Sequence, residues 1–453
     1  MNTVRVGNGC GFWGDNVDAP VLLAERGRLD YLTLEYLAEL TMSILARQKE
    51  RDPEHAGFAT DFVDVLERLA PVLKAQPRLK IITNAGGMNP AACAAAARDV
   101  LHQAGLGDRV VATVSGDDLL PELDQLLEQG HALANLDTGE PLAAIRSRLV
   151  SANAYLGAAP LVKALRQGAA VVITGRVADA SLTLAPAVHE LGWTWDDWDR
   201  LAAGTVAGHL IECGAQVTGG LWCNWQKAPH LEDVGYPVAE IAAGGAFHIT
   251  KPPGSGGRVN RETVSEQLLY EVGDPAAYLT PDVTADFTSV TLSQAGPDDV
   301  LVEHARGQPA TDTYKVSIAY RAGFTASGTL VVFGPGAPAK GRRCGEMILQ
   351  RLRRAGAEPE HSNIECLGAG DCVPGVVPAV ADAPEVVLRV SVRDSRRGVV
   401  ERFTREFAPL VTSGPPGVTG YTTGRPQVRE VFAYWPALIA KSAVTPEVTV
   451  CGG

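Results

Sequence analysis

The sequence lacks the features that mark several large classes of protein. None of its eight cysteines form a CxxC pair, so we expect neither a disulfide framework nor a zinc ribbon. No stretch approaches the ~20 uninterrupted apolar residues that a membrane-spanning helix needs. The first residues have neither the basic start nor the apolar run of a signal peptide. We therefore expect a cytoplasmic protein without a membrane partner.

Positive charge and cofactor motifs are also scarce. The net charge of −12 argues against nucleic acid as a partner, because binding it needs a concentrated positive face. No GxSxG elbow is present and no Walker lysine follows a glycine loop. Counted from Gly7, the glycines after the first strand do not fit GxGxxG, because Phe12 stands where the third glycine belongs. We expect no cofactor and no bound metal, and a small anionic substrate that a locally basic pocket could hold.

What the sequence does contain is a series of apolar runs that end in polar, glycine-bearing loops. These runs are expected to be strands that alternate with amphipathic helices, and they lie at residues 29–35, 79–84, 109–118 and 169–179. Strands that alternate with helices predict an α/β fold, with a mainly parallel sheet flanked by helices and a crevice at the carboxyl ends of the strands. From about residue 289 shorter strand-like runs dominate. The sequence therefore predicts an α/β domain over residues 1–286 and a smaller C-terminal α+β domain over 287–453.

The loop after the second of these strands is the best candidate for binding an anion. Asn89 can cap a helix that begins at Pro90, and Gly86 and Gly87 would let backbone N–H groups face a phosphate or carboxylate. Asn84 stands at the strand end and is assigned to the same site. The alternative is an ordinary strand-to-helix turn.

A second candidate lies in residues 204–220, which are otherwise small and apolar. If one helix runs through this stretch, His209, Glu212 and Gln216 fall on a single stripe. We assign Glu212 and His209 to catalysis and Gln216 to substrate binding. A buried packing segment with satisfied polar side chains is the alternative.

Further candidates follow other strands. Asp179 is a third expected catalytic residue, and Arg176 and Lys251 are expected to bind the anionic part of the substrate. Lys251 stands just before a glycine loop. The aromatic cluster between Trp193 and Trp198 is expected to serve packing or a subunit contact, in a protein that forms homo-oligomers.

Six blocks spread over nearly the whole chain form a recognisable set, at residues 8–15, 30–42, 83–90, 174–179, 208–220 and 266–275. Together they resemble the acyclic terpene utilization AtuA-like family. The resemblance implies a cytosolic bacterial protein linked to the breakdown of branched acyclic terpenoids through acyl-CoA intermediates. It implies no reaction and no residue roles. The residues that match the family blocks are Asn84, Gly86, Gly87, Asn89, Arg176, Asp179, His209, Glu212, Gln216, Lys251 and Glu271.

Three functions remain as hypotheses. The first is a lyase of the hydratase or dehydratase type that acts on a small carboxylate or acyl-CoA, with Glu212 and His209 as acid and base. The second is a hydrolase with a divalent metal at Asp117, Asp179 or Asp282. The third is a non-catalytic subunit that binds a ligand or a partner enzyme. We prefer the lyase, because such chemistry needs no cofactor motif.

Overall fold

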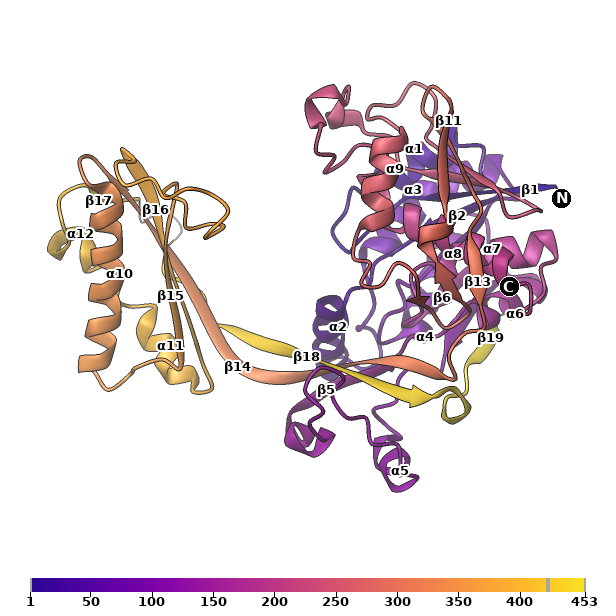
Figure 1. The fold of residues 1–453 in the computed structure, drawn as a ribbon. Helices are drawn as coiled ribbons and strands as arrows, with labels where there is room; N and C mark the ends of the chain where they lie inside the picture. The colour runs from indigo at the N-terminus through magenta and orange to yellow at the C-terminus, as the bar shows by residue number, and fades with distance from the viewer. Residues whose placement is uncertain (1, 421–423, 452–453) are drawn as a thin grey trace. The chain divides into compact units, whose positions relative to one another are not determined.

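The computed structural model describes residues 2–420 and 424–451, which divide into two compact units (Figure 1). The larger unit comprises residues up to Ala319 together with Tyr434 onward, and the smaller one comprises Tyr320–Ala433. Residue 287, where the sequence analysis placed a boundary, lies inside the larger unit. The next two strands, Thr291–Gly296 and Asp299–Glu303, join the large sheet, and the chain leaves that unit only at β14 (Thr313–Phe333).

A ten-stranded sheet organises the larger unit, in the order β11-β12-β8-β7-β1-β2-β3-β6-β4-β19. Its strands are β1 (Thr3–Asn8), β2 (Tyr31–Leu34), β3 (Lys80–Thr83), β4 (Val111–Ser115), β6 (Val171–Thr174), β7 (Val238–Ala242), β8 (Phe247–Thr250), β11 (Thr291–Gly296), β12 (Asp299–Glu303) and β19 (Glu447–Cys451). The central run from β1 to β4 is parallel. The strands beyond it on both sides are antiparallel to their neighbours. The fold is therefore α/β as expected, but the sheet is mixed and not mainly parallel.

Helices cover both faces of this sheet and connect its parallel strands, as the alternating pattern predicted. The helices of this unit are α1 (Ala19–Arg26), α2 (Glu39–Arg51), α3 (Asp61–Ala75), α4 (Pro90–Gln103), α5 (Leu123–Glu128), α6 (Ala159–Arg166), α7 (Ser181–Leu191), α8 (Trp198–Glu212) and α9 (Arg261–Leu269). The remaining strands of this unit are β5 (Leu149–Ala154), β9 (Tyr278–Leu279), β10 (Thr284–Asp286) and β13 (Arg306–Gln308). None of the helices in the described residues is both long and apolar enough to cross a membrane.

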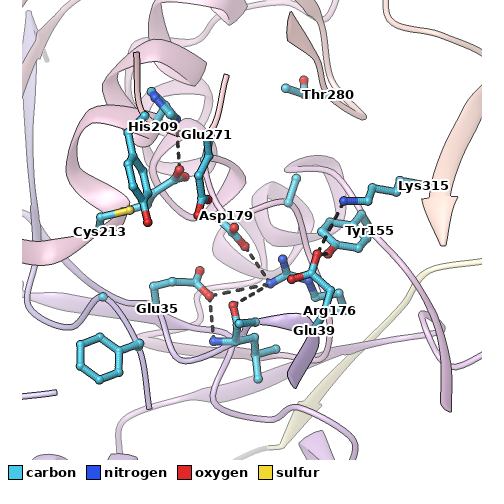
Figure 2. A pocket seen from close by; sticks show the side chains of 18 of the residues that line it. Glu35, Glu39, Tyr155, Arg176, Asp179, His209, Cys213, Glu271, Thr280 and Lys315 are labelled. Atoms are coloured by element: carbon cyan, nitrogen blue, oxygen red, sulfur yellow. Dashed lines mark hydrogen bonds and ion pairs between the residues drawn. The ribbon is translucent and has the colours of Figure 1, made fainter. Parts of the chain in front are cut away.

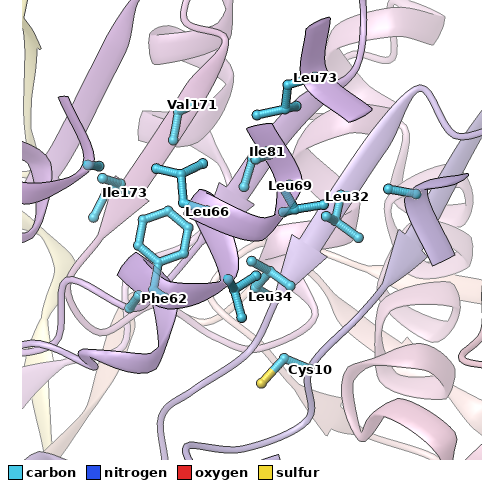
Figure 3. Close-up of a cluster of buried hydrophobic side chains, with 14 of the residues drawn as sticks. Cys10, Leu32, Leu34, Phe62, Leu66, Leu69, Leu73, Ile81, Val171 and Ile173 are labelled. Atoms are coloured by element: carbon cyan, nitrogen blue, oxygen red, sulfur yellow. The ribbon is translucent and has the colours of Figure 1, made fainter. Parts of the chain in front are cut away.

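The core of the larger unit forms where α3 packs on the parallel strands (Figure 3). Phe62, Leu66 and Leu69 share one stripe of α3 and are fully buried, as their helical spacing predicted. They face Leu32 on β2 and Ile81 on β3. Burying one large aliphatic or aromatic side chain contributes about 2 kcal/mol to the stability of the fold. This layer therefore stabilises the strands whose ends form the site.

The smaller unit is an α+β domain with its own core. Its helices are α10 (Ala337–Arg354), α11 (Arg397–Phe403) and α12 (Leu410–Ser413), and its strands include β15 (His361–Leu367), β16 (Glu385–Asp394) and β17 (Val418–Thr419). β14 and β18 (Arg429–Ala440) each run from one unit into the other. The sheet order is β15-β16-β14-β17, and Ile348 on α10 packs with Leu388 on β16. The sequence predicts only short strand-like runs in this part of the chain, whereas β14 is one continuous strand of 21 residues.

Candidate active site

A cavity of about 960 Å³ lies where the parallel strands end (Figure 2). Glu35 follows β2, Arg176 and Asp179 follow β6, and His209 and Glu212 come from the last turn of α8. Loops after parallel strands meet at one edge of a sheet, which is where α/β proteins bind ligands. The expected convergence of Arg176, Asp179, His209 and Glu212 therefore occurs, and Gln216 lines the same cavity.

Arg176 forms the centre of the cavity floor. Its guanidinium group is almost fully buried. One guanidinium nitrogen lies 2.7 Å from a carboxylate oxygen of Asp179 and 3.8 Å from a carboxylate oxygen of Glu35. It also stacks on the ring of Tyr155, with 4.2 Å between the guanidinium carbon and the ring centroid. The backbone N–H of Arg176 donates to Asp117, which fixes the turn after β6. A buried arginine needs such partners, because an unpaired charge in the interior is very costly.

The two carboxyl groups beside Arg176 differ in accessibility. The side chain of Glu35 is 5 % exposed and that of Asp179 is 33 % exposed, so only Asp179 presents much surface to the cavity. Burial raises the pKa of both groups, and the positive charge of Arg176 opposes that rise. The Asn84 side chain donates to Glu35 and accepts from the backbone N–H of Tyr36. Asn84 thus lies behind the cavity wall and holds Glu35 in place.

His209 and Glu212 form a second acid–base group. His209 Nε2 lies 3.0 Å from the carbonyl oxygen of Gln267, and a carbonyl only accepts, so Nε2 carries a hydrogen. The other ring nitrogen, Nδ1, is 3.1 Å from Glu212 Oε1, so one proton lies between the imidazole and the carboxyl group. Burial raises the pKa of Glu212 to about 7, and the negative charge of Asp179 adds to the rise. The hydrogen bond with Glu212 raises the pKa of His209, although burial alone would lower it.

A third polar group lies on the other side of Asp179 in Figure 2. The Tyr155 hydroxyl donates to Glu39 Oε1 at 2.7 Å, and Lys315 Nζ lies 3.6 Å from the same oxygen. Lys315 comes from β14, and its side chain is 45 % exposed. Burial tends to raise the pKa of Glu39, but these partners lower it overall. The cavity therefore has an anionic carboxylate and an accessible lysine here.

Apolar side chains surround the mouth of the cavity. Phe12, Leu136, Leu221, Leu279 and Leu438 all line it and are all more than a third exposed. Exposed apolar side chains that cluster around one opening commonly mark a ligand-binding site. The cavity can therefore hold a ligand with an apolar body.

Several predicted binding residues do not line the cavity. Gly86 and Gly87 belong to a closed turn: the N–H of Gly87 donates to Asn84, and that of Asn89 donates to Gly86. Asn89 caps α4 as predicted, by accepting from Ala92 N. Lys251 lies elsewhere, where Nζ donates to the carbonyl of Ser255 and pairs with Asp298. In this structure the loop 84–90 is a strand-to-helix turn whose donors mostly have partners.

The segment from His209 to Gln216 is not one helix, so the predicted stripe of three residues is wrong. Helix α8 ends at Glu212, and Gly214 has a φ of +59°, in the left-handed region that breaks a helix. Gln216 lies in a following 3₁₀ turn, Gly214–Thr218. It reaches the cavity through this turn and not along the stripe.

The first glycine loop does contain a GxGxxG spacing, in a different register from the one that begins at Gly7. Counted from Gly9, the glycines do match GxGxxG, because Gly11 and Gly14 complete the spacing. The structure lacks the helix that should open directly after them, since α1 begins only at Ala19. The N–H of Gly11 donates to Asp15, and a Cβ on Gly11 would lie 2.8 Å from the backbone of Cys213. These glycines allow close packing of the loop against the end of α8.

Four further residues line the cavity that were not predicted from the sequence: Glu35, Glu39, Tyr155 and Lys315. Glu35 directly follows a predicted strand, so the rule that selected Asp179 could have found it. The other three have no local signal, because β5 and β14 bring Tyr155 and Lys315 into the cavity from distant parts of the chain.

The acids considered for a metal site have protein partners instead. Asp117 accepts from Asn153 and from the backbone of Arg176, and Asp282 accepts from Ser181 and from the N–H of Ala158. In the part of the chain that the structure describes, no three His, Cys, Asp or Glu side chains gather in a way that could hold a metal ion.

Comparison with known proteins gives one match. The searches of curated proteins and of solved structures each found no match to the chain. The family model described as acyclic terpene utilisation family protein AtuA matches residues 4–450, essentially the whole chain. This protein therefore belongs to the acyclic terpene utilisation AtuA family.

Proposed function

We propose that the cavity is the active site of a lyase of the hydratase or dehydratase type. One observation carries the proposal: Glu212 and Asp179 line the same cavity but have different partners. Glu212 shares a proton with His209 and has a pKa of about 7, whereas Asp179 is ion-paired with Arg176 at 2.7 Å. Two carboxyl groups in different environments within one site are a common basis for separate acid and base roles.

Dehydration of a hydroxyacyl compound needs both roles. A base removes a proton from the carbon next to the carbonyl group, and an acid protonates the hydroxyl group that leaves as water. We assign the base to Asp179, which Arg176 favours in its ionised form, and the acid to Glu212, which can receive a new proton from His209. Hydration uses the same groups in reverse. No electron transfer is involved, so the reaction needs no redox cofactor.

The substrate that fits best has an apolar body and one polar, acyl-bearing end. The ring of leucines at the mouth suits the body. Lys315 is the accessible cation of the cavity, so a carboxylate or the phosphates of an acyl-CoA would lie near it, outside the acid-rich floor. Small carboxylates and acyl-CoA thioesters with branched chains are therefore the proposed substrates.

The test is turnover of a panel of branched enoyl and hydroxyacyl thioesters and the corresponding free acids. We expect the wild type to interconvert at least one such pair, and Glu212→Gln and Asp179→Asn each to lower kcat by about 100-fold or more. Glu262→Gln is the matched control, because Glu262 is an exposed carboxylate on α9 that bonds Asn224 outside the cavity. Wild-type rates in both cavity variants would remove the proposed acid and base.

A further inference from the structure

Acidic groups outnumber basic groups in the cavity. Among the described residues, six with carboxyl groups line it: Asp15, Glu35, Glu39, Asp179, Glu212 and Glu271. The basic side chains that line it are Arg176, Lys315 and His209. Because the cavity is only partly open to water, the excess negative charge repels an anionic ligand and attracts a cationic one more strongly than it would in bulk solvent.

Each basic group is already engaged with a carboxyl group. Arg176 pairs with Asp179, and Lys315 lies 3.6 Å from Glu39. His209 is bonded to Glu212. A carboxylate that entered the inner part of the cavity would have to compete for Arg176 and His209, and the surrounding carboxyl groups would repel it. Lys315 is about half exposed, so an anion can still approach it from the open side.

Glu35 indicates what the inner cavity needs instead. It lines the cavity and is 3 % exposed, yet its Oε2 atom has no hydrogen-bond partner. A buried polar atom without a partner is costly, so a ligand group that completes its bonding would be favoured. A hydroxyl group can donate to a carboxylate or accept from a carboxylic acid, and an ammonium group can donate to a carboxylate.

Glu271 places a further carboxylate in the cavity at the expense of backbone strain. Its φ is +57°, in the left-handed region that side chains with a Cβ rarely adopt. It lies just after α9, and Figure 2 shows its side chain next to His209. No ion pair joins it to a basic side chain of residues 2–420 or 424–451. Glu271 as a whole is exposed, so its carboxylate lies on the open side of the cavity, where its charge repels an anion that enters.

We propose that the inner end of the cavity, at Glu35, binds a head group that donates hydrogen bonds, a hydroxyl or an ammonium, and excludes a carboxylate, with the charge of the more exposed Glu271 as a specificity determinant. This inference rests on the proposed function in taking the cavity as the substrate site. It adds the orientation of the substrate: the hydrogen-bond donor lies innermost, and any anionic group stays at the mouth.

The experiment compares three probes that share one apolar chain: hexanol, hexylamine and hexanoate. Binding to the full-length wild type is measured by calorimetry at about pH 7.5. We expect hexanoate to bind at least about tenfold more weakly than the better of the other two. The stronger of hexanol and hexylamine then identifies the head group as a hydroxyl or an ammonium.

Glu271→Gln removes the charge of Glu271 and keeps the shape of the side chain. We expect this variant to bind hexanoate more tightly and hexylamine more weakly than the wild type, whereas Glu262→Gln leaves all three affinities unchanged. Equal binding of hexanoate and the other probes by the wild type, or an unchanged ratio in Glu271→Gln, would overturn the inference. The proposed reaction is refuted by a different measurement, the absence of turnover, and the binding constants do not depend on turnover.

Discussion

Replacing Glu212 by glutamine should make the stability of the larger unit less dependent on pH. The ordinary pKa of a glutamate is 4.5, and that of Glu212 in the folded protein is about 7. Between these values the folded protein holds a proton that the unfolded chain has lost. The free energy of unfolding of the wild type therefore falls as the pH rises through this range.

The size of the effect follows from the same two values. Each pH unit between them is worth about 1.4 kcal/mol, so ionised Glu212 costs the folded state about 3 kcal/mol at pH values above about 7. His209 acts in the same direction. Its pKa is raised by Glu212, so its contribution to stability is present at low pH and is lost as the pH rises through its folded-state pKa. Relative to the wild type, Glu212→Gln should gain up to about 3 kcal/mol between about pH 5 and about pH 8.

Urea unfolding followed by tryptophan fluorescence measures this difference. All seven tryptophans lie in the larger unit, so their fluorescence reports on its unfolding alone. Glu262→Gln, on the exposed face of α9, should keep a constant offset from the wild type over the same range. A constant offset for Glu212→Gln as well, or a gain toward low pH, would refute the reasoning about burial and charge.

Two further predictions concern the floor of the cavity. Arg176→Ala should destabilise the larger unit by about 3–5 kcal/mol at neutral pH, because it leaves the buried Glu35 and the partly buried Asp179 without their cation. The fluorescence assay measures this loss, and a loss below about 1 kcal/mol would contradict the pairing. Burial raises the pKa of Asp117 to about 6 from 3.8, so its ionisation costs the fold about 3 kcal/mol above that pH. Asp117→Asn should therefore become more stable relative to the wild type as the pH rises from about 4 to about 7, and thermal unfolding at several pH values would expose the opposite trend.

The parts of the fold set by local pattern could be predicted from the sequence. The stripe of α3, the cap of α4 at Asn89 and the strand before Glu35 all depend on residues within a few positions of one another. The antiparallel strands could not be predicted in the same way. β19, at the end of the chain, pairs with β4 more than 300 residues earlier, and nothing in either strand specifies that partner.

The candidate site shows the same division. Arg176, Asp179 and Glu212 could be predicted because polar groups at strand and helix ends converge in this kind of fold. Lys315 could not, because it reaches the cavity on a long strand whose sequence shows only alternation. The loop at Gly86 has the composition of an anion site, but its hydrogen bonds close the turn on itself.

The most direct test of the central claim, that Glu212 exchanges a proton near neutral pH, is an infrared titration of this residue. The difference spectrum between the wild type and Glu212→Gln should contain the carbonyl band of a protonated carboxyl group at about pH 6, and this band should disappear by about pH 8, with a midpoint near the pKa of about 7. A band that disappears below about pH 5, or no band in the difference spectrum at any pH, would contradict the account.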